Sequence, residues 1–103
     1  MTASWVAIDF ETATQSRASA CAIGIVTVED GVVVAEREIL IQPPGNEYDG
    51  FNIAIHGITP EDTAYAPTFA EVWPEIERAI DGRLVLAHNA GFDLSVLRHA
   101  SRS

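Results

Sequence analysis

The amino-acid sequence predicts an α/β fold in which a mixed sheet carries flanking helices. Two runs rich in valine and isoleucine, at residues 20–28 and 32–41, flank an Asp-Gly turn and predict a β-hairpin. A capping box formed by Thr68 and Glu71 opens an amphipathic stretch and predicts a helix. Short apolar runs at residues 5–8 and 83–87 predict two further strands. Elements in this order favour one mixed sheet with helices packed on it.

Local signals place the other elements. The run at residues 5–8 stops at Asp9, which predicts a buried strand that ends by presenting an acid. Residues 42–50 are rich in proline and glycine and predict a surface loop. Thr59 and Pro60 predict the start of a short helix, and Asn89 can cap a last helix over residues 90–99. The capped helix should end at residues 81–82, and its apolar face would comprise Phe69, Val72, Trp73, Ile76 and Ile80.

Composition limits the classes of function. The 103 residues suit one domain with a modest core, and the formal charge of −9 comes with no lysine at all. The charge therefore disfavours nucleic-acid binding by general electrostatic attraction, and bound divalent metal would have to neutralise any phosphate at a reacting centre. No apolar run approaches the roughly 20 residues needed to cross a bilayer. Because Cys21 is the single cysteine and no secretory signal is recognisable, we expect a cytoplasmic protein without membrane association or an internal disulfide.

Asp9 and Glu11 are the first candidate site residues. They are two positions apart, so in an extended strand both carboxylates point to one face and can grip the same cation. About two such pairs are expected by chance in so acidic a chain. The position of Asp9 directly after a buried strand favours a functional pair. A surface turn that carries the two acids is an equally weighted alternative. Three other pairs share the spacing and are interpreted as solvated surface: Glu36/Glu38, Glu47/Asp49 and Glu75/Glu77.

Asp93 is the third candidate acid. It lies just past the predicted strand at residues 83–87, in the first turn of the predicted last helix. A carboxylate there suits the helix dipole, which contributes about 0.3 to 1 kcal/mol. Taken alone, the segment favours that structural interpretation.

Together, three motifs resemble a known family. In order and spacing they are similar to the DEDD superfamily of exonucleases, histidine subclass (DnaQ-like), the family of the proofreading epsilon subunit of bacterial DNA polymerase III and of ribonuclease T. The resemblance covers nearly the whole chain. The motifs are Asp9-Phe10-Glu11-Thr12, Ile55-His56-Gly57-Ile58-Thr59 and His88-Asn89-Ala90-Gly91-Phe92-Asp93.

The resemblance implies a ribonuclease-H-like fold and metal-dependent 3′-to-5′ exonuclease activity that releases nucleoside 5′-monophosphates. It implies two Mg²⁺ or Mn²⁺ ions, with Asp9 touching both, Glu11 holding the first and Asp93 supporting the second. Main-chain groups around Thr12 would meet the terminal 3′-hydroxyl. The side chains implied to flank the terminal nucleotide are Gln15, Ile55, His56 and Phe92, although simple core packing remains the alternative for Ile55 and Phe92.

One departure from the family shapes the remaining expectations. A third motif, a histidine followed five residues later by an aspartate, is not present after Asp93. We therefore expect residues 1–103 to be the amino-terminal two thirds of a single exonuclease domain, with its C-terminal part missing. Alone, the chain should bind metal weakly and be inactive, and the strand at residues 84–87 should form an unprotected edge that promotes self-association.

Expected partners are single-stranded or frayed 3′ ends of DNA or RNA, and polymerase subunits are compatible with the resemblance. The choice between DNA and RNA stays open. Two alternatives also stay open: an inactive exonuclease-like scaffold that binds nucleic acid or a polymerase partner, and an unrelated fold with acidic surface turns. Three acids at the motif positions argue against a decayed scaffold.

Overall fold

A four-stranded sheet forms the centre of the computed structural model, which describes residues 3–87, Asp93 and Val96. The strand order is β3-β2-β1-β4, with β1 antiparallel to β2, β2 antiparallel to β3, and β1 parallel to β4. Strand β1 is therefore interior, with β2 on one side and β4 on the other. The strands are β1 (Ser4–Thr12), β2 (Ala20–Glu29), β3 (Val32–Leu40) and β4 (Leu84–Ala87). The helices are the 3₁₀ turn η1 (Pro44–Asn46) and α1 (Gly50–His56), α2 (Pro60–Thr63) and α3 (Phe69–Ile80).

The β2–β3 hairpin forms as predicted. Asp30 and Gly31 both have positive φ, at 50° and 79°, which is the backbone of a two-residue turn matched to the twist of the strands. Asp30 Oδ1 also accepts a hydrogen bond from the Ala3 amide at 3.0 Å, and the Asp30 amide donates to the Ala3 carbonyl at 2.8 Å. The turn thus joins the hairpin to the beginning of β1.

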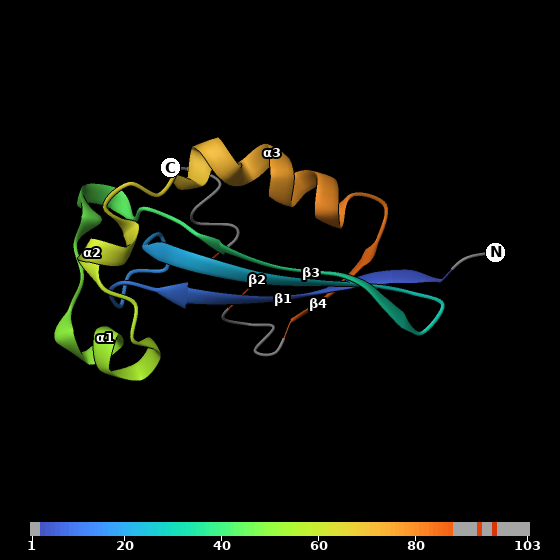
Figure 1. The fold of residues 1–103 in the computed structure, drawn as a ribbon, viewed down its shortest axis with the longest axis horizontal. Helices are drawn as coiled ribbons and strands as arrows, with labels where there is room; N and C mark the ends of the chain where they lie inside the picture. The colour runs from blue at the N-terminus through green and yellow to red at the C-terminus, as the bar shows by residue number, and fades with distance from the viewer. Residues whose placement is uncertain (1–2, 88–92, 94–95, 97–103) are drawn as a thin grey trace.

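Helix α3 covers one face of the sheet (Figure 1). The predicted capping box is present, since the Thr68 amide donates to Glu71 Oε1 at 2.9 Å and the Thr68 side chain accepts from the Glu71 amide at 3.4 Å. Its apolar face packs on alternate residues of the strands, which excludes water from the core. The core members that are at most 5% exposed are Val6, Ile8, Phe10, Ala20, Ile23, Ile25, Ile41, Val72, Ile76 and Val96.

The opposite face of the sheet is not covered by any described helix. Because side chains alternate along a strand, the neighbours of the core residues in β1 point to this open face. Its apolar part includes Leu84 and Leu86, which are 65% and 45% exposed. Leu86 also borders a shallow apolar hollow of about 400 Å³, lined by Trp5, Ala7, Ile8, Asp9, Gly24, Val26, Leu86 and Ala87.

Helices α1 and α2 lie together at the end of the sheet where β1 finishes (Figure 1). Thr59 and Pro60 start α2, as predicted, and Thr59 forms a capping box with Asp62. Helix α1 was not predicted. Asp49 Oδ1 accepts the Asn52 amide at 2.7 Å to begin it, and Gly57 ends it with a φ of 75°. Asp49 is therefore a half-buried helix cap, which corrects its interpretation as solvated surface.

Two further predictions need correction. Strand β1 does not stop at Asp9 but continues to Thr12, so Asp9 and Glu11 both lie within the strand. What stops near Asp9 is the described parallel pairing, which runs from Trp5↔Leu84 to Ile8↔Ala87. The strand predicted at residues 83–87 begins one residue later, at Leu84. In the sheet formed by the described residues, β4 is an edge strand, as predicted.

Part of the chain lies outside the described residues. The predicted last helix at residues 90–99 falls there, except that Asp93 and Val96 are themselves helical. The predicted cap Asn89 and the predicted nucleotide contact Phe92 also lie outside the described part. None of the helices in residues 3–87 has the length and apolar character that crossing a membrane requires.

Candidate active site

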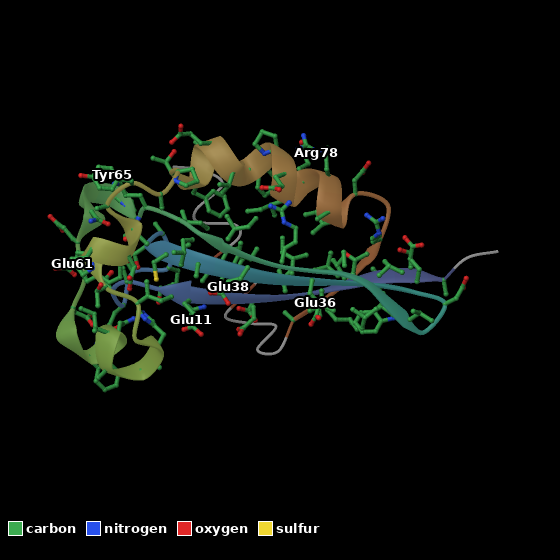
Figure 2. All side chains as sticks on the ribbon, in the orientation of Figure 1. Glu11, Glu36, Glu38, Glu61, Tyr65 and Arg78 are labelled. Atoms are coloured by element: carbon green, nitrogen blue, oxygen red, sulfur yellow. The ribbon has the colours of Figure 1, made fainter. Side chains whose placement is uncertain are left out.

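The open face of the sheet carries the candidate acids of β1. Asp9 and Glu11 alternate with Phe10, whose side chain is only 3% exposed and packs in the core under α3. The two carboxylates therefore share the face away from α3, as their spacing predicts. Figure 2 shows Glu11 on that side of the sheet, in the same region as Glu38.

Asp93 attaches to the same strand from a distant part of the sequence. Its side chain is fully buried, and its Oδ1 accepts a hydrogen bond from the Phe10 amide at 3.0 Å. That amide lies between Asp9 and Glu11 and just beyond the last described pair with β4, Ile8↔Ala87. The bond joins positions 83 residues apart. The third predicted acid is thus held against β1 between the first two, a tertiary role beyond a local effect on a helix dipole.

The charges around Glu11 make its ionised form costly. Burial raises the pKa of the Glu11 carboxyl above its ordinary value of 4.5, and the neighbouring Asp9 raises it further. Asp93 and Glu38 act in the same direction, while His56 opposes them. A carboxylate surrounded by other carboxylates gains most from a bound cation.

Glu38 was not foreseen as a neighbour of the site. The strand register places Asp9 opposite Gly24 and Gly24 opposite Glu38, so these residues form one row across three strands. Gly24 has no side chain, which leaves space between the two acids. The resulting pocket of about 220 Å³ is lined by Asp9, Glu11, Ala22, Gly24, Glu38, His56 and Ile58. Knowledge of the register was the missing signal, because the sequence alone does not align β3 with β1.

A second pocket of about 330 Å³ adjoins the first and shares Glu11 and His56 with it. It brings together four of the five residues predicted to contact the terminal nucleotide, namely Thr12, Gln15, Ile55 and His56. The fifth, Phe92, lies outside the described residues. Sequence reasoning missed the other residues that line this pocket, which are Thr14, Arg17, Phe51 and Asn52.

Helix α1 is fixed to the end of β1 by two polar side chains. Asn52 Nδ2 donates to the carbonyls of Thr12 and Thr14 at 2.9 and 3.1 Å. His56 Nε2 donates to the Thr12 carbonyl at 2.9 Å, and His56 Nδ1 accepts from the Ile58 amide at 3.0 Å. Both ring nitrogens are therefore engaged in hydrogen bonds to the backbone.

The polar anchors leave two apolar side chains at the mouth of the pocket. Phe51 and Ile55 precede Asn52 and His56 by one residue each, and they are 69% and 67% exposed. Four residues apart, they lie on one face of α1. The structure therefore contradicts core packing as the explanation for Ile55. Exposed apolar side chains beside a polar site suit contact with a flat, partly apolar ligand.

The buried thiol of Cys21 lies next to His56, which lines both pockets. Its Sγ lies 3.9 Å from His56 Nε2, and burial raises the pKa of the thiol to about 11. The protonated thiol is a packing group without nucleophilic character at neutral pH.

Within the described part of the chain, no three His, Cys, Asp or Glu side chains are already gathered as a metal-binding group. We predict a separation of about 4 to 6 Å between the Asp9 and Glu11 carboxylates, within reach of a shared cation. The arrangement does offer oxygen donors, which is the donor chemistry that hard divalent cations prefer.

The mixed sheet, its flanking helices and the acids along its interior strand define an α/β protein of the ribonuclease-H-like fold. Residues 6–103 match the RNase T exonuclease family, and the chain belongs to that family. The resemblance inferred from the motifs is thereby confirmed.

Individual relatives agree with this assignment. The chain is 35% identical over 98 residues to DNA polymerase III PolC-type of Thermotoga petrophila, a match that covers 93% of this chain and 7% of the relative. It is 42% identical over 55 residues to the DNA polymerase III subunit epsilon-like protein of Rhodobacter capsulatus, covering 53% of this chain and 8% of that protein. The solved structure of exonuclease X in complex with 5′ overhanging duplex DNA superposes with a TM-score of 0.77 at 30% identity. That match covers 89% of this chain and 52% of the other, so the chain spans only part of each relative.

Proposed function

We propose that this chain forms the acidic part of a 3′-to-5′ exonuclease site that hydrolyses phosphodiester bonds at nucleic-acid ends and releases nucleoside 5′-monophosphates. The observation that carries the proposal is the 3.0 Å hydrogen bond between Asp93 Oδ1 and the Phe10 amide. It brings the third acid of the family pattern to the strand position between Asp9 and Glu11. The names of the relatives, which include an exonuclease solved with DNA, support the same function.

The residues fit a divalent metal in donor type and charge. Asp9, Glu11 and Asp93 supply oxygen ligands. Burial and then the neighbouring Asp9 raise the pKa of Glu11, and a bound cation would favour its ionised form. Asp9 would contact both ions, Glu11 would hold the first and Asp93 would support the second, with Mg²⁺ or Mn²⁺ as the expected metals. When bound, such ions stabilise charge on the attacking and leaving oxygens.

The chain's own residues prepare the substrate. The carboxylates of Asp9, Glu11 and Asp93 determine where the reacting phosphate binds. The pocket of about 330 Å³ beside Glu11 receives the terminal nucleotide. Phe51 and Ile55 offer apolar surface on which an unpaired base can pack, which favours a single-stranded or frayed end. The Thr12 carbonyl is occupied by Asn52 and His56, so those two residues hold the strand end in shape.

His56 is not the general base in this proposal. Its Nε2 proton is held by the Thr12 carbonyl, and its Nδ1 lone pair is held by the Ile58 amide. Removing a proton from water requires a free lone pair within reach of the water. We therefore assign His56 to positioning of α1 and of the pocket.

The test uses the full-length natural protein and a 5′-labelled single-stranded oligonucleotide with Mn²⁺. We expect shortening from the 3′ end in single-nucleotide steps, with nucleoside 5′-monophosphate as the product, and loss of this reaction on chelation. Glu11→Gln should abolish it. Glu77→Gln, which removes the same charge from an exposed position on α3, should have no effect. Trimming that persists under chelation or in Glu11→Gln would overturn the proposal.

The inactive-scaffold alternative makes a distinct prediction. A scaffold would bind the oligonucleotide equally well in Glu11→Gln and would release no mononucleotide under any metal condition.

DNA replication or repair is the setting that the polymerase-related relatives favour, with polymerase subunits as partners.

We also propose self-association through the exposed edge strand β4, where Leu84 and Leu86 are exposed. Sedimentation velocity of the 103-residue chain should show a sedimentation coefficient that rises with protein concentration. Leu86→Arg should reduce this rise. A concentration-independent monomer would contradict this part of the proposal.

A further inference from the structure

The segment between β1 and β2 is folded around the hydroxyl of Ser19. This side chain is only 6% exposed, although it lies in a loop. Ser19 Oγ accepts the Thr14 amide at 3.0 Å and the Thr14 hydroxyl at 3.1 Å, and it donates to the Ser16 carbonyl at 2.6 Å. One buried hydroxyl therefore ties together both halves of the loop.

Other bonds within the loop complete its shape. The Ser16 amide donates to Thr14 Oγ1 at 3.0 Å, and the Ala18 amide donates to Ser16 Oγ at 3.3 Å. The ends are closed by the Ala13 amide, which donates to the Ser19 carbonyl at 2.8 Å. A loop whose polar groups are satisfied internally holds its side chains in defined directions.

This fixed loop carries Gln15 and Arg17 to the pocket beside Glu11. Both side chains are exposed, and both line the pocket together with Phe51 and Ile55. A cation here is notable in a chain with a formal charge of −9 and no lysine.

The other described arginines are placed elsewhere. Arg37 forms an ion pair with Glu75 of α3. Arg83 binds the Ser4 hydroxyl at 2.9 Å and lies 3.7 Å from Glu29. Arg78 lies on α3, on the far side of the sheet from Glu11 (Figure 2). Among residues 3–87, Arg17 is therefore the arginine at the acid-lined site.

A nucleic-acid strand that enters this pocket brings more than one phosphate. Bound metal can neutralise the phosphate at the acids, but the next phosphate along the strand meets a negatively charged protein. A guanidinium group offers paired N–H donors that match two phosphate oxygens and keeps its charge at every working pH.

We propose that Arg17 binds the phosphodiester that neighbours the reacting one, and that Ser19 is the positioning residue that holds Arg17 for this contact. The inference rests on the proposed function and deepens it. Arg17 makes the site specific for an oligonucleotide strand, because a free mononucleotide has no neighbouring phosphodiester to offer.

The first test measures binding of a fluorescent single-stranded oligonucleotide by anisotropy, in chelator so that no cleavage occurs. Arg17→Ala should weaken binding about tenfold, the effect of losing a charge-assisted hydrogen bond. Arg78→Ala is the matched control, since it removes the same charge from α3, and it should change binding less than twofold. Removing one phosphate contact should also flatten the plot of log K against log salt by about 0.7, and Arg78→Ala should not. Equal behaviour of the two variants would overturn the inference.

The second test locates the contact. A neutral methylphosphonate is placed at one linkage at a time over the last four linkages of the strand. At one linkage the modification should weaken binding to the native protein but not to Arg17→Ala, because the charge pair is already lost. The native protein and Arg17→Ala responding alike at every linkage would rule out a phosphate contact.

The third test separates positioning from general stability. Ser19→Ala should weaken oligonucleotide binding and speed hydrogen exchange at the Thr14 amide, and its effect on binding should vanish in the Arg17→Ala background. An additive effect would contradict the positioning role. Should Ser19→Ala fail to fold, the methylphosphonate series still decides the role of Arg17.

The outcomes distinguish this inference from the proposed function. Metal-dependent release of mononucleotides by the native protein, with Arg17→Ala and Arg78→Ala equivalent, overturns only the role of Arg17. A specific Arg17 effect on binding without any metal-dependent release overturns only the exonuclease assignment. Absence of oligonucleotide binding by the native protein overturns both.

Discussion

The two faces of the central sheet differ in what their residues do, although the same strands supply both. On the face under α3, the β1 side chains Val6, Ile8 and Phe10 are at most 3% exposed. On the open face, β1 presents Asp9 and Glu11, and β3 adds Glu38. One face therefore provides the free energy of folding, and the other holds like charges together at a cost to stability. Alternation along a strand lets one segment serve both purposes.

The largest effect should come from the open face and concern activity rather than folding. Asp9→Asn keeps the shape of the side chain but removes its charge, and metal-dependent trimming should fall about 1,000-fold, since charge stabilisation by metal is worth several kcal/mol. Rates on a 5′-labelled oligonucleotide with Mn²⁺ would measure this. Asp81→Asn, at the far end of α3, is the control and should retain the native rate. Comparable losses in both variants would remove the functional distinction between the faces.

The next effect should come from the covered face and concern stability alone. Ile76 is fully buried, so Ile76→Ala should lower the free energy of unfolding by about 2 to 5 kcal/mol. Leu84→Ala, on the open face and 65% exposed, should change it by about 0.5 kcal/mol or less. Urea titrations of both variants, at a protein concentration low enough to keep the chain monomeric, give the comparison. A large loss for Leu84→Ala would mean that the open face is covered in solution.

Asp93 concerns both faces. Its Oδ1 accepts a hydrogen bond from the amide of Phe10, whose side chain lies in the core and whose neighbours Asp9 and Glu11 lie on the open face. Asp93→Ala should leave the buried Phe10 amide without its acceptor and cost about 1 to 3 kcal/mol of unfolding free energy. Asp93→Asn retains an oxygen acceptor and should cost less, while still removing the charge. Urea titration ranks the two variants. If they prove equally destabilised, the hydrogen bond to Phe10 is not what Asp93 contributes.

The smallest effect concerns pH. Burial and the neighbouring Asp9 raise the pKa of Glu11 in the folded protein above 4.5, so the native state binds more protons than the unfolded state in that range. Stability should therefore fall as pH rises from 4.5 through the raised pKa, and stay lower above it. Glu11→Gln should remove this fall and have the higher melting temperature at pH 7, with the difference shrinking toward pH 4. Calorimetry across this range, with and without Mg²⁺, measures it, and Glu77→Gln is the control. A lower melting temperature for Glu11→Gln at pH 7 would contradict the sign.

The hairpin and α3 could be predicted because their signals are local. An Asp-Gly turn between two valine-rich runs, and the Thr68–Glu71 capping box before a periodic apolar face, each specify an element within a dozen residues. Family membership could be predicted too, because the three motifs keep their order along the chain.

Helix α1 escaped prediction for a physical reason. None of its residues is buried, so no apolar face of α1 packs on the core, and polar bonds from Asn52 and His56 hold the helix in place. Its caps, Asp49 and Gly57, were visible in the sequence and could have revealed it. Glu38 escaped because its place beside Asp9 depends on strand register, which the local sequence does not fix.

The bond between Asp93 and Phe10 also has a consequence in time. During synthesis the amino-terminal acids leave the ribosome first, and Asp93 follows 83 positions after Phe10. Until that segment has emerged and docked, Asp9 and Glu11 stand on their strand without the third acid. A chain that stops short of residue 93 therefore lacks both this acceptor for the Phe10 amide and the third acid beside Asp9 and Glu11.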